Sequence, residues 1–127
     1  MSIVIIQQLR EAIMNGKVPS EIDLLYMYSP LCGTCHVASR MLDVVEHLLP
    51  ELRFERLNVN EAPDLAQEYQ VESVPCLIIW RTIEVKQNQQ DLILHNAFVY
   101  PQKIYAFHSI PYLYERLRGG GMDDSSR

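Results

Sequence analysis

The sequence is organised around two cysteines, Cys32 and Cys35, which are separated by two residues and follow a short apolar run. The run, residues 22–28, is too short for a stable helix and predicts a buried strand. After Pro30, apolar residues recur at three- and four-residue steps as far as Leu49, a pattern typical of a helix packed on a sheet. Both cysteines are therefore expected at a strand-to-helix junction, with Cys32 at or before the first turn.

This position favours a reactive thiol at Cys32. The first N–H groups of a helix lack partners and carry partial positive charge, which stabilises a thiolate. Lowering a thiol pKa from ~8.5 to ~7 raises its ionised fraction at neutral pH from a few per cent to about half. Residues 24–42 contain no Asp or Glu, although the whole chain has a net charge of −5. We interpret Cys32 as a nucleophile, and Cys35, one turn further, as a thiol able to attack a mixed disulfide formed there.

Three other uses of the cysteine pair are weaker. A structural disulfide would close a ring of only four residues, worth ~2 kcal/mol against ~4.7 kcal/mol for a ring of about 100. Cys32 to His36 matches the C-x-x-C-H pattern of covalent haem attachment, but that chemistry belongs to exported proteins. A metal site built from these cysteines, His36 and Cys76 is disfavoured, because His36 would point about 100° away from Cys35.

Composition indicates the class of protein. A chain of 127 residues with 48% hydrophobic residues suits a single domain with its own core. The acidic balance does not favour nucleic acid or an anionic membrane, and no run approaches the ~20 apolar residues of a membrane span. The apolar residues 3–6 lack the preceding basic region of a signal peptide, and three cysteines do not suit a disulfide framework. We therefore expect a cytoplasmic protein, in which a C-x-x-C motif is catalytic or metal-binding.

The remaining pattern predicts alternating helices and strands. Residues 3–14 predict an amphipathic helix, with a short strand at 3–6 as the alternative. An alternating strand over 52–59 follows the long helix and completes a right-handed βαβ unit. Its geometry brings the cysteines to the carboxyl edge of the sheet, where open α/β proteins bind ligands.

The second half of the chain predicts further short elements. They are a helix over 64–70, a buried strand over 76–80, a hairpin connection over 81–90, a strand over 92–100 and a terminal helix over 101–118. Pro111 falls inside that last helix and predicts a kink, or two short helices, near Ser109. We expect one domain over residues 1–118 and a disordered tail over 119–127.

This order of elements, with C-x-x-C at the long helix and Val74-Pro75 before the third strand, resembles the thioredoxin superfamily. The resemblance covers roughly residues 23–118 and is most specific over 28–75. It implies an α/β fold, the thioredoxin fold, with a central mixed sheet of a βαβ unit and a β-hairpin flanked by helices.

The resemblance also implies a chemistry. Cys32 would attack a substrate disulfide and Cys35 would resolve the mixed disulfide, in a cycle that needs no bound cofactor. The Val74-Pro75 bond would be cis, would face Cys32 and would bind an extended substrate strand. Substrates would be proteins containing disulfides, and electrons would come from a flavoprotein reductase that uses NADPH.

The active-site loop departs from the family at two positions. Leu31 replaces the usual tryptophan, which removes an aromatic side chain from the substrate platform. Thr34, which follows Gly33, replaces the usual proline, so an N–H and a hydroxyl become available to the sulfur of Cys32. Stabilising that thiolate would make the couple more oxidising.

Further departures lie outside the loop. Tyr26 stands where the family has a buried aspartate that assists proton transfer at the resolving cysteine, and the glycine before the last helix is absent around residues 97–100. Cys76, directly after the expected cis-proline, is either a small buried side chain or a third redox thiol. Two functions remain open: a protein-disulfide reductase, and a redox-sensing or partner-binding module on the same fold with little turnover.

Overall fold

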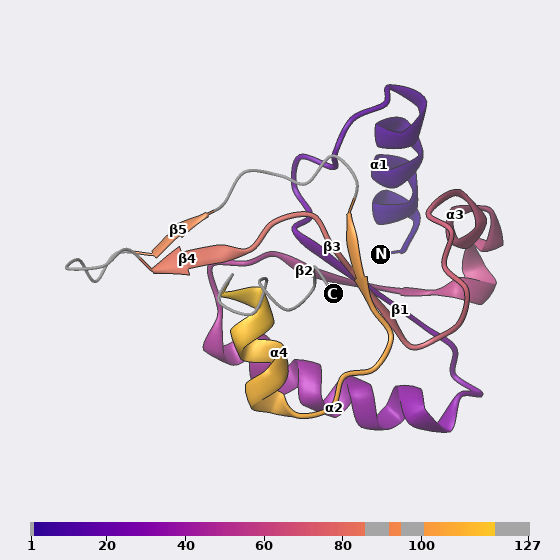
Figure 1. Cartoon of the computed structure of the whole chain (residues 1–127). Helices are drawn as coiled ribbons and strands as arrows, with labels where there is room; N and C mark the ends of the chain where they lie inside the picture. Colours follow the sequence, from indigo (N-terminus) through magenta and orange to yellow (C-terminus); the bar gives the residue numbers. More distant parts are fainter. Residues whose placement is uncertain (1, 86–91, 95–100, 119–127) are drawn as a thin grey trace.

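A four-stranded mixed sheet forms the centre of the computed structural model, which describes residues 2–85, 92–94 and 101–118 (Figure 1). Its strands are β1 (Leu24–Tyr28), β2 (Phe54–Asn58), β3 (Cys76–Ile79) and β6 (Gln102–Ile104), in the spatial order β2-β1-β3-β6. β1 runs parallel to β2 and antiparallel to β3, and β6 runs antiparallel to β3. The α/β class and the mixed sheet agree with the prediction.

Helices cover both faces of this sheet. They are α1 (Ser2–Met14), α2 (Gly33–Leu48), α3 (Pro63–Glu68) and α4 (Ile110–Leu117), with a 3-10 turn η1 (Val59–Glu61) before α3. Figure 1 shows α1 and α3 on one side of the sheet and α2 and α4 on the other. The predicted N-terminal helix and the β1–α2–β2 unit are therefore confirmed, and the alternative strand at residues 3–6 is wrong. None of the helices in the described ranges is long and apolar enough to cross a membrane.

The alternation of side chains along β1 divides the core into two clusters. Leu24 and Tyr26 face α2 and α4, whereas Leu25 and Met27 face α1 and α3, and all four are at most 1% exposed. The first cluster includes Leu42, Val45, Leu77, Ile79, Leu113 and Leu117; the second includes Ile6, Leu9, Leu57, Leu65, Ile78 and Trp80. Apart from the half-buried Tyr28, β1 and β3 are buried on both faces, and neither strand contains a charged residue.

A buried ionic cluster joins the strands at the edge opposite the cysteines. Asp23, which is fully buried just before β1, accepts hydrogen bonds from the backbone N–H of Arg53 (2.8 Å) and from its guanidinium (2.9 and 3.1 Å). Arg81, after β3, donates to the same carboxylate (3.1 Å). Burial alone would raise the pKa of Asp23, but the two guanidinium groups outweigh burial and hold it below its usual value.

The C-terminal part of the chain differs from the prediction of one helix over residues 101–118. Residues 102–104 form β6, which pairs with β3, and α4 begins only at Ile110. The hydroxyl of Ser109 caps α4 by accepting the backbone N–H of Tyr112 (3.1 Å). Pro111 lies in the first turn, where its missing N–H leaves no bond unmade, so it starts the helix and does not kink it. Pairing with β3 is a long-range contact that the local pattern did not reveal.

The predicted hairpin partner of β3 is also wrong. Leu92–Leu94 form β5, but β5 pairs with β4 (Ile83–Val85) in a separate two-stranded sheet that projects from the body (Figure 1). The position beside β3 belongs to β6. Three predicted segments lie wholly or partly outside the described residues: the connection at residues 86–90, the strand at residues 95–100, and the tail at residues 119–127. The position of the missing glycine, around residues 97–100, also lies outside them.

Candidate functional site

The loop after β1 places Cys32 at the N-cap of α2. The backbone N–H of Cys32 donates to the carbonyl of Ser29 (3.1 Å), and that of Leu31 donates to the Ser29 hydroxyl (3.2 Å). Cys32 keeps an extended backbone (φ −95°, ψ 114°), and its sulfur accepts the backbone N–H of Cys35 (3.1 Å). The sulfur thus replaces the side-chain oxygen of an ordinary cap. The predicted strand-to-helix junction is present, at the carboxyl edge of β1 and β2.

The surroundings of Cys32 stabilise its thiolate. Interaction with the Cys35 side chain is the largest cause that lowers the pKa of Cys32, followed by the hydrogen bond with the Thr34 hydroxyl, whose oxygen lies 3.3 Å from the sulfur. The backbone N–H groups of Cys35 and Thr34 act in the same direction. Cys32 is partly exposed, so an incoming disulfide can reach its sulfur.

Cys35 has the opposite character. It is buried, and burial raises its pKa, as does the hydrogen bond with Cys32. Both thiols are free, so the structure represents the reduced form. The pair therefore combines an accessible thiol that ionises more readily than usual with a buried neighbour that holds its proton more tightly than usual. Such a pair can make and then resolve a mixed disulfide.

A cis peptide bond between Val74 and Pro75 faces this pair. The carbonyl oxygen of Val74 lies 3.8 Å from the Cys32 sulfur, within reach of a thiol donor. Both residues are half-buried, directly before β3. The cis bond and its position beside Cys32 agree with the expectation from the sequence.

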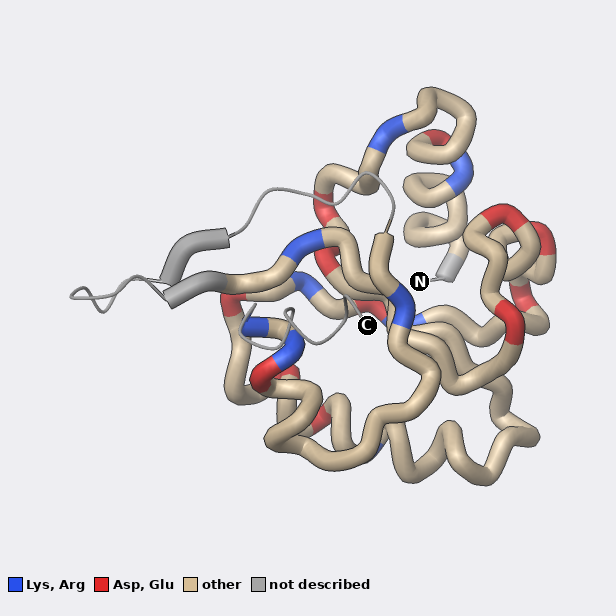
Figure 2. Tube along the Cα trace, in the orientation of Figure 1, with Lys and Arg blue, Asp and Glu red and all other residues tan. Residues whose placement is uncertain are grey.

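A shallow apolar groove of about 380 Å³ adjoins the cysteine loop. Its lining combines the first half of α2, Pro75 and the loop before α4: Thr34, Val37, Ala38, Met41, Pro75, Tyr105, Ala106, Phe107 and His108. Figure 2 shows that charged residues are absent from residues 24–39 and 104–114, which meet here. On the loop itself Leu31 is 92% exposed, and open space surrounds the Cα of Gly33. The surface around the sulfur is therefore neutral and largely apolar.

Residues 105–108 were missed by the sequence interpretation, because they fell inside the expected terminal helix. Ser109 followed by Pro111 is a helix-start pattern that could have placed these residues in a loop.

Two other residues singled out in the sequence lie on opposite sides of the sheet. Tyr26 lies beneath α2, and its hydroxyl donates to the carbonyl of Cys35 (2.8 Å). Cys76 points into the cluster under α1 and α3, away from the cysteine pair, and is fully buried. Burial raises the pKa of Cys76 to about 11, although hydrogen bonding with Tyr105 opposes the shift.

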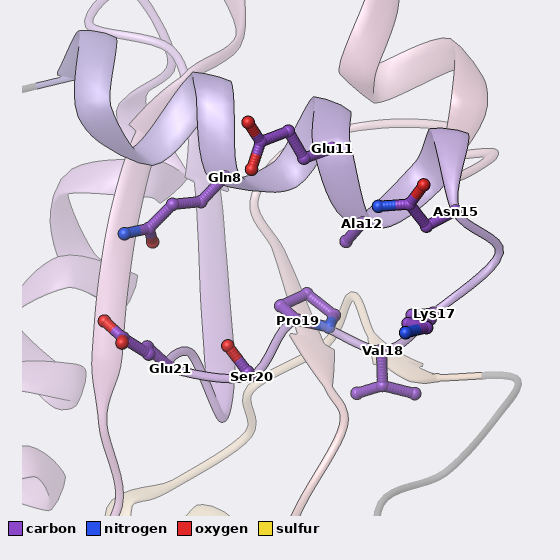
Figure 3. A pocket seen from close by; sticks show the side chains of 9 residues that line it. All are labelled: Gln8, Glu11, Ala12, Asn15, Lys17, Val18, Pro19, Ser20 and Glu21. Carbon is purple, nitrogen blue, oxygen red and sulfur yellow. The ribbon is translucent and has the colours of Figure 1, made fainter.

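Another cavity lies away from the cysteines. It has a volume of about 440 Å³ between the end of α1 and the loop that leads into β1, and polar side chains such as Gln8, Glu11 and Asn15 line it (Figure 3). It therefore adjoins the amino end of β1, whereas Cys32 follows the carboxyl end. Within the described ranges, no group of three or more His, Cys, Asp or Glu side chains is arranged to hold a metal ion.

Comparison with solved structures supports the fold. Mitochondrial thioredoxin 3 from Saccharomyces cerevisiae, in its oxidized form, superposes with a TM-score of 0.59 at 21% identity, covering 90% of this chain and 89% of that one. Chloroplastic thioredoxin z gives a TM-score of 0.61 at 17% identity, covering 94% and 89%.

Comparison with protein sequences extends this similarity. The chain is 39% identical over 101 residues to thioredoxin-like protein YusE from Bacillus subtilis (strain 168), covering 80% of this chain and 81% of the relative. It is 26% identical over 76 residues to thioredoxin from Porphyra purpurea, covering 59% and 68%. The model of the family Thioredoxin matches residues 4–97. With the cysteine pair at the start of α2 and the cis-proline facing it, these matches establish that the chain belongs to the thioredoxin family.

Proposed function

We propose that this thiol–disulfide oxidoreductase reduces disulfides in other proteins through a cycle at Cys32 and Cys35. The observation that carries the proposal is the contrast between the two thiols: the partly exposed Cys32 has a lowered pKa, and the buried Cys35 has a raised pKa. The nucleophile reacts as a thiolate, which a lowered pKa favours. The resolving thiol attacks only after the mixed disulfide has formed, so a raised pKa that keeps it protonated until then suits its role.

The cycle has two displacements. The Cys32 thiolate attacks one sulfur of a client disulfide, the client S–S bond breaks, and the other client sulfur leaves as a thiolate. Cys35 then loses its proton and attacks the Cys32 sulfur, which releases the second client thiolate and forms the Cys32–Cys35 disulfide. Two electrons pass from the protein to the client.

The client would bind beside the cysteines in extended form. The half-buried Val74-Pro75 segment offers backbone groups to a client strand, and the active-site loop of Leu31, Gly33 and Thr34 forms the neighbouring rim. The uncharged surroundings suit a client disulfide with neutral neighbours. We place the protein in the cytoplasm, a reducing compartment. There an NADPH-dependent flavoprotein reductase would reduce the Cys32–Cys35 disulfide back to the dithiol.

Single cysteine variants test the cycle. Cys32→Ser should abolish reduction of insulin disulfides, because no nucleophile remains. Cys35→Ser should accumulate a covalent mixed disulfide between Cys32 and the client, visible by mass spectrometry and lost on adding dithiothreitol. Retained turnover in Cys32→Ser would refute the mechanism.

Cys76→Ala tests the role of the third thiol. Unchanged kinetics would assign Cys76 to packing, whereas a shifted reduction potential of the Cys32–Cys35 pair would assign it a modulating role.

A redox-sensing or partner-binding module is the second candidate. Tyr26, a hydroxyl in place of a carboxylate, lies beneath Cys35, and this favours slow turnover. The reduction potential of the pair separates the candidates. A value near the ~−270 mV of thioredoxin supports a reductant, and a value tens of millivolts higher favours a sensor or specialised exchanger, since ~30 mV is a tenfold shift in equilibrium.

A further inference from the structure

The cis-proline segment, residues 72–75, is held to the rest of the molecule by few hydrogen bonds. The turn after α3 ends with the backbone N–H of Val71, which donates back to α3 (2.8 Å), and the pairing of β3 with β1 begins at Cys76. Between these points, the backbone N–H groups of Ser73 and Val74 donate to no acceptor among the described residues. The segment therefore keeps backbone donors available for a client strand, and another contact has to hold it in position.

Tyr105 supplies such a contact from a different part of the chain. It follows β6, in the loop before α4, and its hydroxyl oxygen accepts the backbone N–H of Glu72 at 3.1 Å. The two residues are 33 positions apart in the sequence, so this bond joins two separate loops. Glu72 lies two residues before Val74, whose carbonyl oxygen lies 3.8 Å from the Cys32 sulfur. The bond therefore fixes the segment close to the point where it faces the nucleophile.

The ring of Tyr105 is anchored independently of its hydroxyl. It packs against the cluster under α1 and α3, and it lines the apolar groove together with Pro75 and Phe107. Tyr105 is partly buried, and burial raises the pKa of its phenol, so the hydroxyl stays neutral at neutral pH. A neutral hydroxyl on an anchored ring offers an acceptor at a fixed place. Tyr105 thus connects the wall of the groove with the segment proposed to bind the client backbone.

We propose that Tyr105 is a positioning residue, which holds the cis-proline segment in the conformation that accepts a client strand. This inference rests on the proposed function. The hydrogen bonds of the Cys32 sulfur go to other groups, so Tyr105 would act on client binding and not on the attack by Cys32. Without the hydroxyl, residues 72–74 would sample other conformations, and the client would have to order them on binding. A small reagent that needs no strand pairing should react as before.

Kinetics with a protein client and with a small reagent test this role. Tyr105→Phe removes only the hydroxyl and keeps the ring. Its KM for insulin, with dithiothreitol as reductant, should rise by about fivefold, the effect of losing one hydrogen bond, while kcat stays unchanged. Alkylation of Cys32 by iodoacetamide should keep the wild-type rate. Tyr69→Phe is the matched control, because the buried Tyr69 hydroxyl, at the end of α3, has no hydrogen-bond partner among the described residues; KM should not change.

Hydrogen–deuterium exchange of the reduced full chain gives a readout that does not depend on activity. In Tyr105→Phe the backbone amide of Glu72 should exchange about fivefold faster than in the wild type, whereas the amides of β1 and β3 should keep their rates. Unchanged exchange at Glu72, or an unchanged KM, would overturn the inference. Equal losses of rate with insulin and with iodoacetamide would also overturn it, because they would indicate an effect on Cys32 itself. A wild-type protein that fails to reduce insulin would instead refute the proposed function, while the exchange experiment still decides whether Tyr105 fixes the segment.

Discussion

The two cysteines of one motif differ because a few atoms around each sulfur differ. Cys32 lies at the helix N-cap, where the backbone N–H of Cys35 and the hydroxyl of Thr34 point at its sulfur. Cys35 lies inside the first turn, where burial favours the protonated thiol. In the proposed cycle, the position of each sulfur relative to the helix start, and not the residue type, distinguishes the nucleophile from the resolving thiol.

Removing the Thr34 hydroxyl tests the local control of Cys32. Thr34→Val should raise the pKa of Cys32, because it deletes a hydrogen bond to the thiolate. Alkylation of Cys32 by iodoacetamide should then slow several-fold near pH 7, where the thiolate fraction falls, and match the wild-type rate at alkaline pH. Thr34→Ser keeps the hydroxyl and should follow the wild-type profile, measured by mass spectrometry against pH. Identical profiles for the Val and Ser variants would show that the hydroxyl has no such role.

At the scale of elements, the two ends of β1 have different surroundings. Its carboxyl end leads into the cysteine loop, where charges are absent, and its amino end begins beside Asp23, which binds Arg53 and Arg81. The ionic cluster joins β1 to the start of β2 and the end of β3. The central strands are therefore held together at the end of the sheet away from the reactive thiols.

Breaking this cluster should destabilise the fold. Asp23→Asn leaves Arg81, which is only 17% exposed, without its counter-charge. The free energy of unfolding should fall by about 3 kcal/mol. This is at the low end of the loss expected for a buried ion pair, because Arg53 is 46% exposed. Asp43→Asn is the matched control: Asp43 is 70% exposed in its ion pair with Arg56, so its loss should change stability by less than about 1 kcal/mol. Urea unfolding measures both variants, and equal losses would contradict the assigned role.

The same carboxylate predicts a dependence of stability on acid. The pKa of Asp23 is lower in the folded state than in the unfolded chain, so its contribution is complete above the unfolded value of about 4 and is lost as pH falls through the folded value. Wild-type stability should therefore decline below about pH 4 more steeply than that of Asp23→Asn. If urea unfolding gives the same decline of stability below about pH 4 for the wild type and for Asp23→Asn, Asp23 does not supply this dependence.

At the scale of the whole molecule, the central sheet carries one hydrophobic cluster on each face. Trp80, the only tryptophan, lies in the cluster under α1 and α3, whereas α2 and α4 pack on the other face. Since β1 and β3 contribute side chains to both clusters, neither cluster can be lost while the other keeps its strands.

Unfolding should therefore be a single cooperative transition. Trp80 is 1% exposed, so its fluorescence reports the α1 and α3 side, and far-UV circular dichroism is dominated by the longer α2 and the other helices. The two signals should give the same urea midpoint, as for a two-state domain. A fluorescence transition at clearly lower urea than the circular dichroism would mean that the α1 and α3 side unfolds first.

Local patterns determined much of this molecule from the sequence alone. The helical stripe from Cys35 to Leu49 predicted α2, the apolar run before it predicted β1, and the alternating pattern after it predicted β2. The spacing of the cysteines at the start of the helix predicted a redox pair. These features depend on neighbours within a few residues, and the periodicity of side chains records them directly. The resemblance of the loop and of Val74-Pro75 to a known family added the expectation of a cis-proline facing Cys32.

Tertiary structure decided the features that depend on distant residues. The strand beside β3 is β6 and not the nearer β5, the loop before α4 completes the apolar groove, and Cys76 faces away from the redox pair. The partners of Tyr26, and the arginines that surround Asp23, likewise come from other elements. Strand pairing and burial minimise the free energy of the whole chain, so short polar or mixed segments such as residues 102–104 take the structure that their partners allow.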